Sequence, residues 1–261
     1  MASSRGPEQP KPALMSVPRV SRSFDLRSFD ADAPAPRLLV SVRNADEADL
    51  ATGAGADLVD AKDPERGALG ALPAATVRAI VAQVGGRTLA SAVAGEPDRA
   101  ALVPAIAAMA ATGIDVVKVA VGDAVSADDL ARAAEAASGR LIAVLFAEAG
   151  DAAALVPRLR RAGFLGAMID TAGKDGRRLT DHLSLPALAA FTRACRDHGL
   201  VSGLAGSLAL SDIAILAPLG PHYLGFRGGL CGAGDRRQAL DPVRVAEAVR
   251  LIRASARRDA A

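Results

Sequence analysis

The chain has 261 residues, of which 51% are hydrophobic and 23% charged, and its formal net charge is +2. This composition is typical of a globular protein with a large apolar core, and the small charge with scattered basic residues argues against a nucleic-acid partner. Aromatic residues make up only 3% and tryptophan is absent, so base-stacking surfaces are not expected either.

The rest of the composition indicates a cytoplasmic protein. Cys195 and Cys231 form neither a disulfide framework nor a zinc-ligand spacing, which fits a reducing compartment. No apolar run approaches the roughly 20 residues of a membrane-spanning helix, and the apolar segment of a secretory signal is missing. We find no metal-ligand cluster and no dinucleotide-binding fingerprint, so we expect no metal, no cofactor and no membrane partner.

Residues 1–36 differ in composition from the rest of the chain. They contain six prolines, together with serine and arginine, and show no sustained periodicity. We predict a disordered or loosely attached extension. Its acidic residues argue against a transit peptide. Residues 37–261 are predicted to form a single catalytic domain.

From Leu38 onward, short apolar runs alternate with alanine-rich stretches. The predicted strands are residues 38–42, 57–62, 88–93, 115–120, 141–146, 166–172, 200–205 and 223–226. The predicted helices are residues 45–56, 73–85, 97–113, 127–139, 151–163, 185–199, 210–220 and 241–258. Several helices have Pro, Asp or Ser at the start and Gly at the end, as helices commonly do. Eight alternating pairs predict an α/β fold, a single (β/α)8 TIM barrel, with a doubly wound open sheet as the alternative.

Lysine is rare in this chain and unevenly placed. There are 27 arginines but only four lysines, Lys11, Lys62, Lys118 and Lys174. Arginine cannot replace lysine where an amine must lose its proton to attack a carbonyl. Three of the four lysines fall at the carboxyl ends of predicted strands or just beyond, which is the rim where TIM-barrel enzymes carry out chemistry.

Carboxylates accompany these lysines. Asp60 and Lys62 end the second predicted strand, and their spacing of two puts both side chains on one face. Lys118 lies within an apolar run, where burial favours a lowered pKa or a carboxylate partner. Asp170 ends the sixth strand, four residues before Lys174. Taken singly, Asp60 and Lys62 could form a structural ion pair. Lys118 could reach solvent at the rim, and Lys174 could be a solvated loop charge. Their shared placement favours catalysis.

Glycine-bearing loops follow the seventh and eighth predicted strands, at residues 204–212 and 225–237. Phosphate sites of TIM barrels form there from exposed backbone N–H groups. The candidates are Gly206, Ser207, Gly228 and Gly229, with Arg227 as a charge partner. Ordinary tight-turn chemistry is the alternative for both loops.

Lysines with carboxylate partners beside a phosphate site suggest Schiff-base carbon–carbon chemistry on a phosphorylated aldehyde or ketone. Clustered cations would lower the pKa of one lysine towards neutrality, and a neighbouring aspartate would move protons.

Several motifs together resemble the (5-formylfuran-3-yl)methyl phosphate synthase family. They are "LLVSVRNADEADLATGAGADLVDAKDPERGALGA", "DVVKVAVG", "GAMIDTAGKDGRRLTDHLS", "LAGSLALSDI" and "GFRGGLCGAGDR", in order over about residues 38–252. The resemblance implies a TIM-barrel lyase of methanofuran biosynthesis, found in methanogens and with relatives in methylotrophic bacteria. It would join two molecules of glyceraldehyde 3-phosphate, with loss of one phosphate and water, for a furan-containing one-carbon carrier.

The resemblance also implies roles for single residues. Lys62 matches the Schiff-base lysine and Asp60 its neighbour, while Lys118, Asp170 and Lys174 match other active-site residues. The extension at residues 1–36 departs from the archaeal pattern. Two alternatives remain: a class I aldolase or isomerase acting on a triose phosphate, and a non-catalytic barrel that binds sugar phosphates. We expect a homo-oligomer, although no surface patch is diagnostic.

Overall fold

The computed structural model describes residues 35–122, 124–173 and 176–256. Within these ranges eight parallel strands close into a barrel in chain order, with β8 pairing with β1. The strands are β1 (Arg37–Val42), β2 (Leu58–Ala61), β3 (Leu89–Val93), β4 (Val116–Ala120), β5 (Leu141–Phe146), β6 (Gly166–Asp170), β7 (Val201–Leu204) and β8 (Tyr223–Phe226). The predicted TIM barrel is confirmed, and the alternative of an open sheet is wrong.

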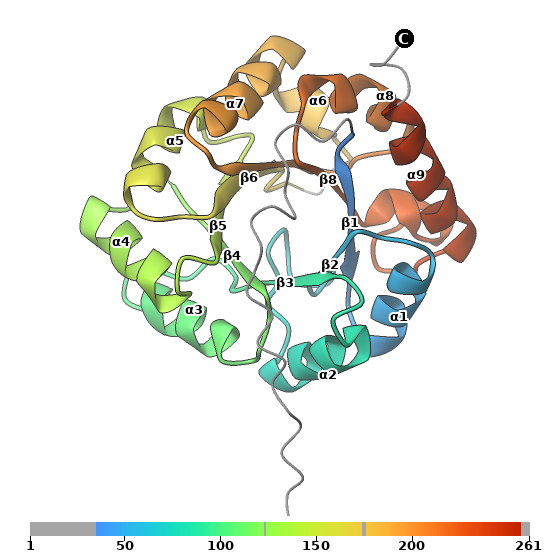
Figure 1. Ribbon diagram of the computed structural model, residues 1–261, viewed down its shortest axis with the longest axis horizontal. Coiled ribbons are helices and arrows are strands. Elements are labelled where there is room, and N and C mark those ends of the chain that lie inside the picture. Colours follow the sequence, from blue (N-terminus) through green and yellow to red (C-terminus); the bar gives the residue numbers. More distant parts are fainter. Residues whose placement is uncertain (1–34, 123, 174–175, 257–261) are drawn as a thin grey trace, which may run out of the picture.

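The helices form a ring around this barrel (Figure 1). They are α1 (Ala45–Gly53), α2 (Ala74–Val84), α3 (Leu102–Ala110), α4 (Ala127–Ala136), α5 (Ala152–Arg161), α6 (Leu179–His182), α7 (Leu185–Asp197), α8 (Ile213–Leu216) and α9 (Pro242–Ser255). Short 3-10 turns flank α8, at η2 (Leu210–Asp212) and η3 (Ala217–Leu219), and follow β8, at η4 (Gly228–Leu230) and η5 (Gly232–Gly234). The eighth predicted helix is present as α9. The seventh is divided among η2, α8 and η3, and α6 was not predicted.

Local capping explains where several helices begin. The side chains of Asn44 and Ser126 accept hydrogen bonds from backbone N–H groups in the first turns of α1 and α4. Asp241 does the same at α9. These contacts satisfy N–H groups that have no partner inside a helix, so these side chains fix the helix starts.

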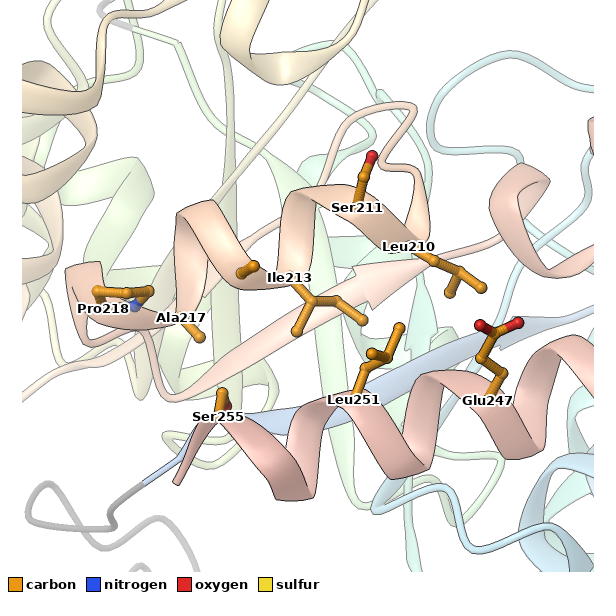
Figure 2. Close-up of a pocket in the computed structure, with 9 residues that line it drawn as sticks. Leu210, Ser211, Ile213, Ala217, Pro218, Glu247, Leu251 and Ser255 are labelled. Carbon is orange, nitrogen blue, oxygen red and sulfur yellow. The ribbon is translucent and has the colours of Figure 1, made fainter. Parts of the chain in front are cut away.

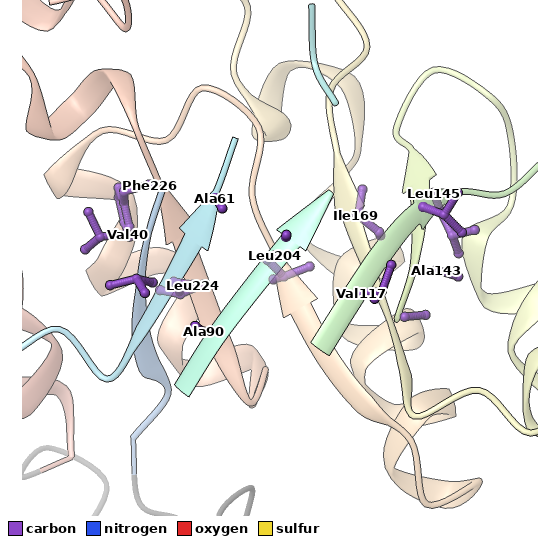
Figure 3. Close-up of a cluster of buried hydrophobic side chains, with 14 of the residues drawn as sticks. Val40, Ala61, Ala90, Val117, Ala143, Leu145, Ile169, Leu204, Leu224 and Phe226 are labelled. Atoms are coloured by element: carbon purple, nitrogen blue, oxygen red, sulfur yellow. The ribbon is translucent and has the colours of Figure 1, made fainter. Parts of the chain in front are cut away.

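The strands are buried on both faces, which explains their nearly continuous apolar sequences. Side chains such as Val40, Leu224 and Ile169 face outward and pack in the layer between strands and helices (Figure 3). Their neighbours, such as Leu39 and Met168, belong to a second cluster that fills the barrel interior. Because inward-facing positions are apolar below the rim, a polar side chain at such a position stands out.

Tyr223 occupies much of the barrel interior. It is 1% exposed, and a Cβ added to Gly203 on the neighbouring strand would lie 2.2 Å from its Cζ. Glycine is therefore required at position 203 to make room for the aromatic ring.

The predicted extension, residues 1–36, lies outside the described residues except for its last two. In the described part of the chain, no helix combines the length and the apolar character needed to cross a membrane.

Candidate active site

Inward-facing polar side chains gather at the carboxyl ends of the first strands. In the barrel register Asp60 of β2 pairs with Ser41 of β1 and with Ser91 of β3. Lys118 lies one strand further on, in β4. All four residues are buried. Sequence reasoning missed the two serines, although each is a single polar residue at an inward position near the end of an apolar strand.

Asp60 and Lys118 form a buried ion pair. Lys118 Nζ lies 2.7 Å from Asp60 Oδ1, and the two side chains are 1% and 2% exposed. Ser91 Oγ donates to the same oxygen over 2.7 Å, and Ser41 Oγ donates to Oδ2 over 3.4 Å. The carboxylate thus has the partners that a buried charge requires.

The pKa of Lys118 is lowered from its ordinary value, as the sequence suggested for a lysine in an apolar run. Burial is the main cause, and the positive charge of Lys62 adds to it, whereas Asp60 and Asp170 oppose the shift. A lysine whose proton is held less tightly, in contact with a carboxylate, is suited to proton exchange within this pair.

Lys62 makes the second ion pair, across the barrel mouth. Its Nζ lies 3.2 Å from Oδ2 of Asp170 at the end of β6, and the side chains are 12% and 3% exposed. The other Asp170 oxygen accepts a hydrogen bond from Thr171 N over 2.8 Å. Asp60 and Lys62 share one face, as their spacing predicted. They do not pair with each other, so the alternative of a structural Asp60–Lys62 ion pair is wrong.

A cavity of about 470 Å³ opens above these residues. Asp60, Lys62 and Asp170 line it, whereas Lys118 lies behind Asp60 and does not. The predicted phosphate-binding residues line the same cavity: Gly206, Ser207, Arg227, Gly228 and Gly229. The barrel therefore brings the predicted residues together, apart from Lys174, which lies outside the described residues.

Gly206 and Gly229, one in each loop, are required by close approach of neighbouring atoms. Gly206 has φ of +114°, and a Cβ there would lie 2.8 Å from Thr171 Cγ2. A Cβ on Gly229 would lie 2.5 Å from the carbonyl oxygen of Leu208, which belongs to the loop after β7. The loops after β7 and β8 therefore pack directly on each other, and this packing needs glycine whether or not a phosphate binds.

The contacts of Arg227 do not favour its predicted role as a phosphate ligand. Its Nη1 and Nη2 contact both carboxylate oxygens of Glu47 in α1. Three carbonyl groups accept its remaining donors, those of Ser41, Arg236 and Gln238. All five guanidinium N–H groups are thus engaged within the protein, and Arg227 fastens the loop after β8 to β1 and α1.

Two other arginines line the cavity, and sequence reasoning missed both. Arg244, in the first turn of α9, donates from Nη1 to Gly229 O over 3.4 Å. Arg236 donates from Nη2 to Gly67 O over 2.8 Å, so it reaches from the loop after β8 to the loop after β2. Among 27 arginines, no sequence signal distinguished these two.

Glu148, which follows β5, holds the loop after β6. Its carboxylate accepts hydrogen bonds from Ala172 N at 3.0 Å and Gly173 N at 3.1 Å. Burial by itself raises the pKa of Glu148, but these N–H donors bring it below the ordinary value. His182 Nε2 lies 3.7 Å from Glu148 Oε1. Glu148 therefore fixes the backbone directly after Asp170.

A second cavity, of about 320 Å³, lies outside the barrel between α8 and α9. Figure 2 shows Ile213 and Leu251 facing each other across it, with Glu247 at its edge. Its lining is largely apolar and shares no residue with the cavity at the barrel mouth. The lysine–carboxylate pairs therefore make the barrel mouth the candidate active site.

Solved structures with low sequence identity share the fold. KGPDC from Streptococcus mutans matches with a TM-score of 0.61 at 10% identity, over 84% of this chain and 98% of that chain. TrpF from Jonesia denitrificans matches with a TM-score of 0.57 at 18% identity, over 85% and 98%. At this identity they support the barrel architecture alone.

Comparisons of sequence are more specific. The family model described as 4-HFC-P synthase matches residues 38–249. A Methylorubrum extorquens protein, provisionally named a (5-formylfuran-3-yl)methyl phosphate synthase, is 63% identical over 87% of this chain and 95% of its own length. The (5-formylfuran-3-yl)methyl phosphate synthase of Methanopyrus kandleri is 36% identical over 78% and 92%. This chain therefore belongs to the (5-formylfuran-3-yl)methyl phosphate synthase family.

Proposed function

We propose that this protein is a lyase that joins two molecules of glyceraldehyde 3-phosphate into (5-formylfuran-3-yl)methyl phosphate, through a Schiff base on Lys62. The observation that carries this proposal is the pair of lysine–carboxylate contacts at the barrel mouth, in which Lys62 lines the cavity and Lys118 does not. A substrate carbonyl can reach Lys62, whereas Lys118 is buried behind Asp60.

The atoms of the reaction balance without an oxidant or reductant. Two triose phosphates contain the atoms of one furan product, one inorganic phosphate and two waters. In the product, one triose keeps its phosphate as the phosphomethyl group. The other supplies the formyl carbon, and its third carbon, which has lost phosphate, forms the new carbon–carbon bond.

The triose that loses phosphate is the one we assign to Lys62. Its aldehyde carbon would become the iminium carbon, which acidifies the hydrogen on the next carbon. Removal of that proton by a carboxylate, either Asp170 or Asp60, lets the phosphate leave from the third carbon with the C–O bond electrons. The second triose then loses the proton on its own second carbon to a carboxylate and adds through that carbon to the third carbon of the first triose, with the iminium accepting the electron pair. Ring closure and loss of two waters complete the furan. Hydrolysis of the iminium releases the formyl group and restores the lysine.

Lys118 and Asp60 would together accept and return protons during these steps, because the amine and the carboxylate are in direct contact. For Lys174 we propose the acid–base role that the family resemblance implies. The glycine loops after β7 and β8, at Gly206, Ser207, Gly228 and Gly229, would hold the retained phosphate through backbone N–H groups.

Trapping with borohydride tests the proposal. The protein is incubated with glyceraldehyde 3-phosphate, reduced, digested and mapped by mass spectrometry, and furan formation is followed by ultraviolet absorption. We expect an adduct on Lys62 and none in Lys62→Arg, which keeps the charge but lacks the nucleophile. An active Lys62→Arg protein would refute the role of Lys62, and an adduct on Lys118 or Lys174 would transfer that role. An aldol or isomerase product, or binding without turnover, would support the alternatives instead.

We also propose a cytoplasmic location, because both cysteines are free and buried. The product would serve the synthesis of a methanofuran- or methylofuran-type one-carbon carrier.

A further inference from the structure

The proposed reaction uses two phosphates and keeps only one. If the site bound both phosphates in the same way, it would not favour loss of the phosphate from the Lys62-bound triose. The retained phosphate needs a cradle that binds it throughout, whereas the leaving phosphate needs a group that binds more strongly as negative charge develops on it. The cavity should therefore contain a cationic group apart from the glycine backbone N–H groups that hold the retained phosphate.

Four described cations line the cavity, and their contacts separate them. Lys62 is paired with Asp170, and all five donors of Arg227 are engaged. Arg244 lies beside Gly229, at the glycine loops. Arg236 differs from all three. Its backbone belongs to the loop after β8, next to Gly228, but a hydrogen bond to Gly67 O holds its guanidinium at the loop after β2. Among the described residues, this hydrogen bond engages one of the five N–H donors of the Arg236 guanidinium.

The charged groups around Arg236 include Asp170, which pairs with Lys62, the proposed Schiff-base residue. Burial lowers the pKa of its guanidinium, and the negative charge of Asp170 opposes this shift. Arg227 lowers the pKa further, while Glu65 and Asp63 raise it to a lesser degree. Arg236 also lines the same cavity as Asp170, the carboxylate that contacts Lys62 Nζ at 3.2 Å. In a triose bound to Lys62, the phosphate is attached two carbons from the iminium carbon. The phosphate would therefore lie close to Lys62 and Asp170.

We propose that the Arg236 guanidinium binds the leaving phosphate of the Lys62-bound triose, at a subsite separate from the backbone N–H groups of Gly206, Ser207, Gly228 and Gly229. The inference rests on the proposed function. As the C–O bond breaks, its electron pair goes to the phosphate, and the proton from the neighbouring carbon goes to a carboxylate. The guanidinium can offer two parallel N–H donors to the phosphate oxygens and remains charged throughout.

The test compares Arg236→Gln and Arg236→Lys with a neighbouring control, Arg237→Gln. The side chain of Arg237 contacts Asp235 and is 63% exposed. It does not line the cavity. For each variant, the rate of furan formation and the mass of the borohydride-trapped Lys62 adduct are measured. For Arg236→Gln we expect furan formation to fall about 10- to 100-fold, the range for loss of a charge-assisted hydrogen bond. The adduct should still form, and a larger share of it should retain phosphate.

Arg236→Lys should recover part of the rate, and Arg237→Gln should match the parent protein. Loss of the adduct together with turnover in Arg236→Gln would overturn the inference, since Arg236 would then be needed for binding or for the fold. A parental rate and adduct mass would also overturn it. If the parent protein itself forms neither adduct nor furan, the proposed function fails, which is a distinguishable result.

Discussion

The buried Asp60–Lys118 pair allows a quantitative prediction of stability. Lys118→Met removes the cation and leaves the Asp60 carboxylate buried with two hydroxyl partners among the described residues. Asp60→Asn leaves the lysine buried without its carboxylate. Breaking a buried pair by removing one partner costs about 3–5 kcal/mol. Replacing both partners with neutral groups removes the unpaired charge, so the double variant should lie within about 1 kcal/mol of the parent.

Urea unfolding followed by circular dichroism at neutral pH measures this cycle. Each single variant should lose about 3–5 kcal/mol of unfolding free energy, which is about 6–20 °C in Tm for a domain of this size. Because the double variant should be nearly neutral, the coupling energy should be close in magnitude to the sum of the two single losses. Single variants that each lose less than about 1 kcal/mol, or effects that add in the double variant, would show that the two charges are not coupled as the 2.7 Å contact implies.

The same pair predicts a dependence on pH. Asp60 raises the pKa of Lys118 against the effect of burial, so Asp60→Asn should lower that pKa further. Between the lowered folded pKa and the ordinary unfolded pKa, the unfolded chain binds more protons, so stability should rise with pH through this window. A pH-independent unfolding free energy for Asp60→Asn over this window would contradict the argument.

Two further predictions concern residues below the rim. Burial, with Arg196 and Arg37, lowers the pKa of His222 to about 4. Stability should therefore fall as pH drops from about 6.5 to 4, by about 3 kcal/mol. His222→Gln should abolish that loss in urea unfolding curves, and an unchanged loss would assign it to other groups. Gly203→Ala places a methyl group 2.2 Å from the Tyr223 ring and should cost about 1–3 kcal/mol. Adding Tyr223→Leu should restore part of this stability, and no recovery in the Tm of the double variant would contradict the steric explanation.

The sequence predicted the barrel because alternation of apolar runs with alanine-rich helices is a local signal. It also predicted that Asp60 and Lys62 share a face, since this depends only on the strand period. It could not predict their partners, because Lys118 and Asp170 reach them through the register and closure of the barrel. The contacts of Arg227 were equally inaccessible, since its carboxylate partner Glu47 lies 180 residues earlier in the chain. Homo-oligomer formation, which the alanine-rich helices permit, stays a prediction.

The order of the strands divides the site between the two halves of the chain. β1 to β4 supply Asp60, Lys62 and Lys118, while β5 to β8 and their loops supply Asp170, the glycine loops and Arg236. On the proposed mechanism, the amine that forms the Schiff base belongs to the first half-barrel, and the groups that bind phosphate belong to the second. Neither half would be active alone, but two separately produced halves that reassemble would restore the Lys62–Asp170 contact. Exchange of the second half between family members should likewise change which phosphorylated aldehyde is accepted without changing the amine that attacks it.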